Sequence, residues 1–134
     1  MVIVSPRLLS FLGWFMGFSK TAKGMAVGGV FLIVRSEDYL QPWLLNHERI
    51  HMRQQRELLI IGAIILHIIE TFIAFFILRL PWKDSYHWIS CEQEAYRNQN
   101  NLDYLKHRKP FAQFHYLFDK RKFSHHEGVV TYVD

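Results

Sequence analysis

The sequence predicts a mainly α-helical, membrane-associated protein that folds as one domain over residues 1–134. Half of the 134 residues are hydrophobic and 16% are aromatic, a heavy apolar load for so short a chain. Residues 58–80 form a nearly unbroken apolar run. As a helix of ~1.5 Å per residue the run covers about 34 Å, close to the ~30 Å hydrocarbon core of a bilayer. A chain of this size has little other material to surround such a helix. We therefore expect a spanning or deeply embedded helix.

The N-terminal part is predicted to contain a short helix and one strand. Residues 8–18 are largely apolar, with Gly13 and Gly17 as interruptions. The residues that follow offer no small-x-small cleavage site of a signal peptide, so we expect a retained interfacial or short embedded helix. Residues 30–34 are apolar and mostly β-branched, which predicts a strand.

Three helices are predicted after this strand. Pro42 suits the first turn of a helix, which then continues into the apolar run and ends before Pro81. A second helix is predicted from residue 84 or 85 to about residue 106. Residues 111–123 predict a short amphipathic helix, and residues 128–134 predict a frayed tail or a short strand.

The charge distribution indicates which partners the chain can bind, and the cysteine content indicates whether it can form a disulfide. The net charge is +4 and the pI is near 9.3, but the basic residues are spread along the chain, which argues against nucleic acid as a partner. Arginines and lysines precede and follow the apolar run, so anionic lipid headgroups explain them better and the orientation in the bilayer stays open. The basic residues of segment 106–122 favour a cytoplasmic C-terminus. The single Cys91 excludes a disulfide within the chain.

Residues 47–51 spell His-Glu-Arg-Ile-His, an HExxH motif inside the first long predicted helix. Positions i and i+4 of a helix lie one above the other, so His47 and His51 can hold one Zn²⁺ while Glu48 activates a bound water. This combination is typical of a metallopeptidase site. The strand at residues 30–34 would then offer its edge to an extended peptide substrate.

A catalytic zinc needs a third protein ligand, and Glu92 is the strongest candidate. It lies on the second predicted helix and precedes the small Ala95 by three residues, which lets two helices approach closely. Glu94 in the same segment is a rival. The third ligand could also be His115, or it could come from a second protomer.

The HExxH motif and the ExxA segment that begins at Glu92 resemble those of gluzincin metallopeptidases, particularly the membrane-embedded prenyl-protein (CaaX type) and bacterial stress-response proteases, whose second motif is ExxAD. The chain is also similar to a set of short bacterial membrane proteins with HExIHxxQQ followed by ExEAY. The resemblance implies a minimal zincin-like helical core with one short strand or hairpin. It implies a Zn²⁺ cofactor bound by His47, His51 and Glu92, with Glu48 as the general base. It further implies a peptide or membrane-protein substrate at or near the bacterial inner membrane. Tyr96 stands where the prenyl-protein proteases have Asp, so the contact that orients a ligand must come from elsewhere or from a phenol.

Helix geometry sets a condition on these ligands. If the long helix were straight, Glu70 would lie ~28 Å from His51, too far to share a metal with it. A helix returning antiparallel would also keep Glu92 tens of ångströms away. The long helix must therefore bend, with Gly62 as its weakest point, or else His115 or a neighbouring chain completes the site. We prefer the bend together with Glu92.

Other polar residues are candidates for supporting roles. Five side chains could stabilise an oxyanion, and the sequence does not rank them: Tyr86, His87, Arg97, His115 and Tyr116. Gln55 shares a helix face with the two histidines and either lines the site, orients a ligand or is exposed at the membrane surface. His67 and Glu70 are costly inside a bilayer, so we expect them to pair with each other or to serve substrate or proton access. The His-His-Glu sequence at residues 125–127 is expected to belong to a solvated tail.

The competing interpretation is a non-catalytic membrane protein in which a structural zinc, or the His/Glu cluster itself, holds short helices together. A closed fourth coordination position would indicate this class. A basic membrane-surface adaptor with a chance HExxH would bind no stoichiometric metal. Either class, like the peptidase, is compatible with an oligomer.

Overall fold

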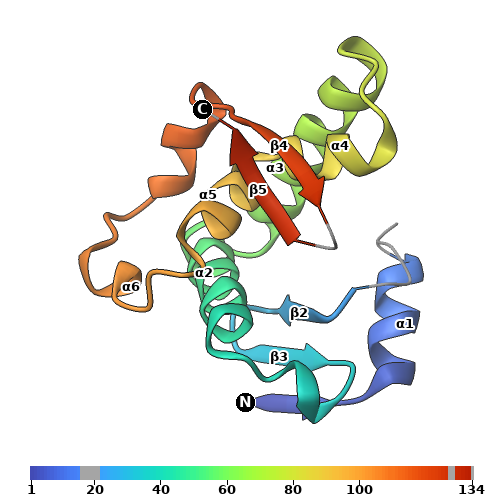
Figure 1. The fold of residues 1–134 in the computed structure, drawn as a ribbon, viewed down its shortest axis with the longest axis vertical. Coiled ribbons are helices and arrows are strands. Elements are labelled where there is room, and N and C mark those ends of the chain that lie inside the picture. Colours follow the sequence, from blue (N-terminus) through green and yellow to red (C-terminus); the bar gives the residue numbers. More distant parts are fainter. Residues whose placement is uncertain (16–21, 127–128, 134) are drawn as a thin grey trace.

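The structure is a computed structural model that describes residues 1–15, 22–126 and 129–133, with side chains in residues 1–14 and 22–121. It is mainly helical and contains a small mixed sheet at its N-terminal end (Figure 1). A second, two-stranded sheet follows the last helical segment. The prediction of a mainly helical chain with a short strand or hairpin is confirmed at this level.

The first sheet contains three strands in the order β1-β3-β2. The predicted strand is present as β3 (Phe31–Val34), which is the central strand and pairs in parallel with β1 (Val2–Val4). β2 (Gly24–Val27) pairs antiparallel with β3 and forms one edge. The predicted use of residues 30–34 as a substrate-binding edge is therefore wrong, because β1 and β2 flank that strand on both sides.

The N-terminal helix α1 (Pro6–Phe15) packs against this sheet. A small apolar cluster of Leu9, Met25 and Ile33 forms the interface. The helix overlaps the one predicted at residues 8–18, of which residues 16–18 lie outside the described part of the chain.

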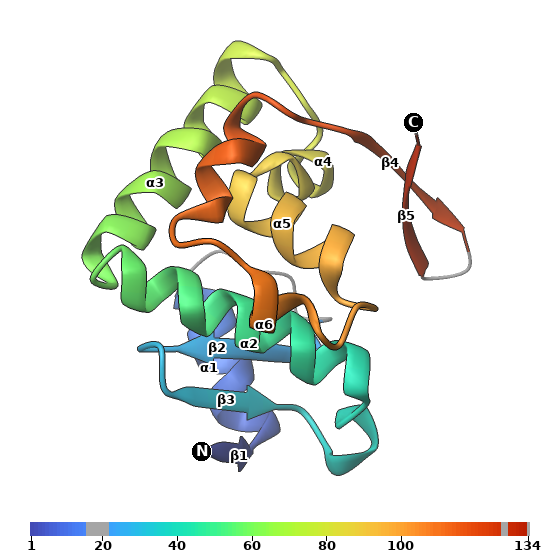
Figure 2. The same cartoon turned by 90° about the vertical axis from the view of Figure 1, so that its left-hand side faces the viewer.

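The long predicted helix is bent. α2 (Pro42–Glu57) is followed by α3 (Ile61–Phe72), which continues into the π-helical turn η2 (Ile73–Ile77), and the axes differ by 109° (Figure 2). The bend that the sequence required is present near Gly62, as predicted, but residues 58–60 form it and Gly62 itself lies in the first turn of α3.

Leu59 and Ile60 produce the bend. Both have φ in the left-handed range, 54° and 59°, and the ψ of −57° at Ile60 lies outside the αL region. A left-handed conformation costs an L-residue about 1–2 kcal/mol, and it is least favourable for a β-branched side chain such as Ile. The packing of α2 and α3 on the rest of the chain must outweigh this local cost.

The predicted second helix over residues 84–106 is divided. Its first part, α4 (Trp82–Trp88), is separated from α5 (Ser90–Asn98) by Ile89, whose backbone is extended with ψ of 136°. A further short helix, α6 (Tyr104–His107), follows. The single-helix prediction is wrong because the chain turns at Ile89, where the Glu70 carboxylate accepts a hydrogen bond from the Ser90 N–H.

The C-terminal predictions are partly correct. The short helix predicted over residues 111–123 is present in its first half as a 3₁₀ helix, η3 (Ala112–Leu117), but residues 122 and 123 belong to a strand. β4 (Lys122–His126) and β5 (Val129–Val133) form an antiparallel pair, which agrees with the predicted short strand near the C-terminus. The side chains of the His-His-Glu sequence lie outside the described part.

Among the described residues, no single helix combines the length and the apolar composition of a membrane span. The pair Pro42–Glu57 and Ile61–Ile77 reaches that length only when its two bent parts are counted together.

Candidate metal centre

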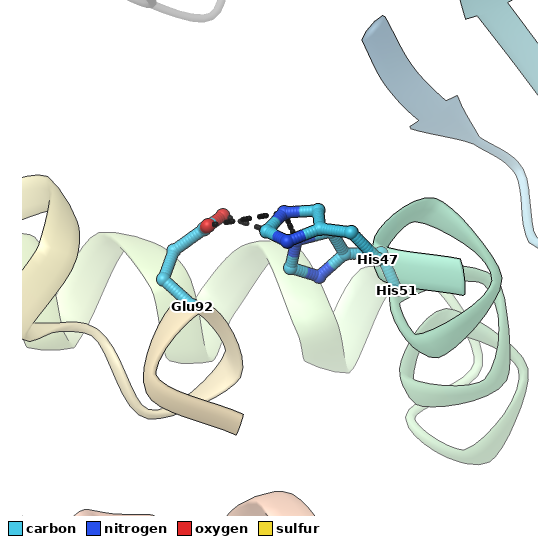
Figure 3. Close-up of side chains that lie close together, drawn as sticks. All are labelled: His47, His51 and Glu92. Carbon is cyan, nitrogen blue, oxygen red and sulfur yellow. Dashed lines mark hydrogen bonds and ion pairs between the residues drawn. The ribbon is translucent and has the colours of Figure 1, made fainter. Parts of the chain in front are cut away.

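The two histidines of HExxH and one carboxylate of α5 meet at a single point. His47 and His51 project from the same face of α2, and their Nε2 atoms are 3.1 Å apart. The Glu92 carboxylate lies opposite, with oxygens 3.7 Å from His47 Nε2 and 3.4 Å from His51 Nε2 (Figure 3). One ligand atom from each residue lies within 4.8 Å of the other two, an arrangement that could hold a metal ion.

Two turns of the chain bring Glu92 to the histidines. The bend between α2 and α3 sends the apolar helix away from α2, and the break at Ile89 lets α5 return against α2. Ala95 is fully buried, three residues after Glu92, which fits the close helix approach that the ExxA spacing predicted. One chain therefore brings the three groups together without a second protomer.

Each imidazole is held by an amide oxygen on its far side. The Gln99 Oε1 lies 3.1 Å from His47 Nδ1, and the Gln54 Oε1 lies 2.8 Å from His51 Nδ1. An amide oxygen only accepts hydrogen bonds, so each Nδ1 carries a proton, and Nε2 is the ring nitrogen that faces Glu92 and can bind a metal once it is unprotonated. This is the tautomer that metal ligation through Nε2 requires.

The carboxylate of Glu92 also fits a cation. Glu92 is 5% exposed, and its Oε2 has no hydrogen-bond partner in the described part of the chain. The Tyr86 hydroxyl donates a hydrogen bond to this carboxylate, so the orienting contact is a phenol but not that of Tyr96. A buried carboxylate oxygen without a partner is costly, and a bound metal ion would satisfy it.

The charges of the three groups are strongly coupled. Burial disfavours the ionised form of Glu92, but the two imidazoles and the Tyr86 hydroxyl outweigh it and lower its pKa to about 2. Burial also opposes a charge on His51, yet Glu92 raises the pKa of His51 to about 9. Burial and the charge of His51 lower the pKa of His47 to about 3. Without a metal, His51 therefore carries a proton, and its positive charge lies next to the negative charge of Glu92.

Glu48 lies beside the edge strand β2 and is 4% exposed. Its carboxylate accepts a hydrogen bond from the Ala26 backbone N–H, and a Cβ at Gly24 would stand 3.4 Å from Glu48 Oε1. Burial raises the pKa of Glu48 to about 7, against the opposing charge of His51. A carboxyl group that titrates near neutrality can both accept and deliver a proton.

The rival ligands are engaged elsewhere. Glu94 accepts hydrogen bonds from Arg108, Gln54 and Tyr104. Glu70 accepts hydrogen bonds from Ser90 and Lys120, and His115 is exposed on η3. Glu94, Glu70 and His115 therefore do not belong to the group formed by His47 and His51.

The five candidates for oxyanion stabilisation divide into two groups. Tyr86 and His87 lie at the cluster, since Tyr86 bonds Glu92 and the His87 ring is 4.8 Å from Tyr96, which itself packs on His47. The others form a separate group: Arg97 pairs with Asp119 and stacks on Tyr116, and His115 is next to it in η3.

Gln54 and Gln99 are the residues that sequence reasoning missed. Gln54 lies three residues after His51, so helical spacing could have identified it, whereas the sequence prediction named Gln55. Gln55 accepts a hydrogen bond from the Gly29 N–H and donates one to the Ala26 carbonyl, and so holds the β2–β3 hairpin on α2. Gln99 follows α5 in a segment without a motif, and no sequence signal pointed to it.

Comparison with protein-family models, curated proteins and solved structures finds no match for this chain. What the structure adds to the two sequence motifs is the buried group of His47, His51 and Glu92, which could hold a metal ion.

Proposed function

We propose that the protein is a zinc-dependent metallopeptidase of gluzincin type, with His47, His51 and Glu92 as ligands and Glu48 as the general base. The observation that carries this proposal is the convergence of two Nε2 atoms and one unpartnered carboxylate oxygen, with both imidazoles oriented from behind by amide oxygens. In zinc sites, hydrogen bonds to the ring nitrogen that does not bind the metal fix the tautomer and the orientation of each histidine, and the two amide oxygens are placed to do so here.

The ligand set supports a catalytic zinc rather than a structural one. Two imidazoles and one carboxylate suit Zn²⁺, and structural sites are closed by four protein ligands. In the described part of the chain the group contains three ligands. A bound zinc would lower the pKa of a water in the fourth position and polarise a substrate carbonyl.

Glu48 supplies the proton transfers. Its carboxylate accepts a proton from the attacking water as the water oxygen bonds to the carbonyl carbon, and it returns a proton to the amide nitrogen as the C–N bond breaks. The Ala26 N–H holds this carboxylate at the edge of β2. We infer that an extended peptide lies along this edge near Gly24, which lies beside Glu48: a Cβ at residue 24 would stand 3.4 Å from Glu48 Oε1.

We further propose that the substrate is a peptide or membrane protein met at or near the bacterial inner membrane. The apolar surface of α3, which follows the zinc-binding helix directly, supports this location.

The test combines metal analysis with a cleavage assay on the detergent-purified full chain. The parent protein and Glu48→Gln should each retain one zinc per chain, and only the parent should cleave a broad peptide library. Glu92→Gln should lose stoichiometric zinc. Glu37→Gln, an exposed carboxylate on the 3₁₀ turn η1 (Glu37–Tyr39), is the matched control and should change neither.

Two results would overturn the proposal. Stoichiometric zinc without cleavage of any library member would indicate a structural zinc that holds α2 and α5 together. Absence of bound zinc in the parent after loading would exclude both the peptidase and the structural site.

A further inference from the structure

One face of α3 and η2 is a broad apolar surface that no other described segment covers. Its side chains recur at intervals of three and four residues, so they lie on one side of the helix. Ile61, Ile68 and Phe76 are 69%, 60% and 62% exposed. We define the apolar face by six residues: Ile61, Ile64, Ile65, Ile68, Phe72 and Phe76.

The opposite face of the same helix belongs to the protein interior. Glu70 is 3% exposed, and its carboxylate accepts hydrogen bonds from the Ser90 backbone and hydroxyl and from Lys120. Ala74 is fully buried on this side. Glu70 therefore faces inward, and the six residues of the apolar face include no ionisable group.

Exposed cations lie at both ends of the apolar face. Along the chain, Arg53 and Arg56 precede it on the last turns of α2, where Arg53 pairs with Glu57 and Arg56 donates a hydrogen bond to the Gly29 carbonyl, and Arg79 and Lys83 follow it. Trp82, 52% exposed, stands between the latter two. Arginine and lysine near anionic headgroups, with tryptophan at the apolar–polar boundary, are typical of a segment at a membrane surface.

We propose that α3 and η2 lie in the plane of the membrane interface, with the apolar face in the acyl chains of one leaflet and both cationic ends at the headgroups. The helix Ile61–Ile77 is about 25 Å long, shorter than the ~30 Å hydrocarbon core. A span would place the cations of its two ends on opposite sides of the bilayer. The chain instead reverses at Arg79, with φ of 54°, and α4 packs back against α3 and η2.

This arrangement is that of an amphipathic helix lying on a membrane, and it replaces the spanning helix expected from the sequence. The occupant of the face is lipid, because the face is broad, carries large branched and aromatic side chains without a polar group, and is bounded by positive charge at both ends. A soluble monomer seldom exposes so continuous an apolar surface.

The first experiment measures binding of the full chain to vesicles of phosphatidylcholine containing about 30% phosphatidylglycerol, by sedimentation after removal of detergent. Ile65→Glu/Ile68→Glu should weaken binding at least tenfold. Leu102→Glu is the matched control, since Leu102 is 58% exposed but lies after α5, and it should bind like the parent. Arg79→Gln/Lys83→Gln should weaken binding to these vesicles and leave the weaker binding to pure phosphatidylcholine unchanged.

The second experiment measures how deeply individual residues of α3 and η2 lie in the bilayer. Spin labels are placed singly at residues 61, 68 and 76 in a Cys91→Ser background, and their accessibility to oxygen and to a polar nickel reagent is compared. The in-plane arrangement predicts similar shallow depths for all three labels. A label at residue 68 much deeper than both others would establish a span, and a steady gradient from 61 to 76 would establish a re-entrant hairpin; either result overturns the proposal.

Membrane binding does not depend on the metal. Glu92→Gln, which should lose zinc, and Glu48→Gln, which should lose only cleavage, should therefore both bind vesicles like the parent, so a failed cleavage assay and a failed binding assay are distinguishable. Equal binding by the parent and by Ile65→Glu/Ile68→Glu, or a dimer in solution that the double substitution disrupts, would overturn the assignment of lipid as the occupant.

Discussion

The two helices on either side of the bend reverse the usual relation between polarity and burial. α2 buries polar side chains, among them Asn46, His47, Glu48 and Gln54, whereas the apolar α3 buries only Glu70 to the same degree and exposes most of its isoleucines. Three residues separate these helices. Burial here follows the availability of partners and not hydropathy alone.

The partners on the α2 side are specific. The Asn46 amide faces the carbonyls of Asn98, Gln99 and Asn101 at 2.9–3.2 Å, and so fixes the segment that supplies the amide behind His47. Gln54 contacts both Cys91 and Glu94 on α5. A buried polar group that is fully hydrogen-bonded adds specificity to a fold, whereas an isoleucine on the outer face of α3 has no protein surface to meet.

The largest expected effect concerns the end of α2. Arg108 bonds Glu57 and Glu94, and its side chain is 1% exposed. Arg108→Met should leave the fully buried Glu94 without a counter-charge and Glu57 with only the exposed Arg53, and should lower the free energy of unfolding by about 3–5 kcal/mol. Arg53 pairs with the same Glu57 but is 52% exposed, so Arg53→Met should cost less than about 1 kcal/mol. Urea titration in mild detergent measures both, and equal losses would contradict the contrast.

The second effect compares one residue type in the two helices. Ile50 in α2 is 0% exposed and Ile68 in α3 is 60% exposed. Ile50→Ala should cost about 2–5 kcal/mol of unfolding free energy, and Ile68→Ala about 0.5 kcal/mol or less. The same urea titration in detergent separates them. A large loss for Ile68→Ala would mean that protein, and not lipid or detergent, covers this face.

The third effect separates the two adjacent glutamines of α2. Gln54→Ala removes the amide oxygen behind His51 and should weaken zinc binding about 10- to 100-fold. Gln55→Ala removes only the contacts to the β2–β3 hairpin and should leave zinc affinity within about twofold, since it touches no ligand. Competition with a chromophoric chelator gives both affinities. The assignment fails if Gln55→Ala has the larger effect.

The smallest effect, about tenfold for one pH unit, is the pH dependence of metal affinity. Because Glu92 raises the pKa of His51 to about 9, His51 carries a proton at lower pH that a metal must displace. A falling pH favours the protonated, metal-free cluster, so affinity should decrease about tenfold per pH unit from pH ~9 to pH ~7. Calorimetry at pH ~7 in two buffers of different ionisation enthalpy should detect about one proton released per zinc. Release of no proton would contradict the charge state inferred for the cluster.

Local patterns predicted the parts of the site that lie within one turn of chain. The HExxH spacing on a helix that begins at Pro42 placed His47 and His51 on one face, and the ExxA spacing identified Glu92 beside a buried Ala95. The need for a bend followed from helix length alone. Its position near Gly62 was predicted, but the residues that form it were not, because the sequence marks Gly62 as flexible while packing imposes the positive φ angles on Leu59 and Ile60.

Contacts between distant segments could not be predicted. Three features depend on residues far apart in the chain: the edge strand β2, the break at Ile89 and the contact of the Gln99 amide with His47. No local sequence pattern indicates which distant residues these segments contact. Gln54 was within reach of helical spacing, but two adjacent glutamines gave no ground for choosing between them.

The sequence by itself determined the chemistry of the candidate site: two imidazoles and a carboxylate base at helical spacing, a second carboxylate downstream, and an apolar run beside them. Helical periodicity and residue type act over a few residues, so they can be deduced without the fold. Only the tertiary structure decided that Glu92 and not Glu94 meets the histidines, and that the apolar run has an inner face around Glu70 and an outer face without a protein partner. Those outcomes depend on the 109° bend, a strained feature that only the packing of the whole chain can stabilise.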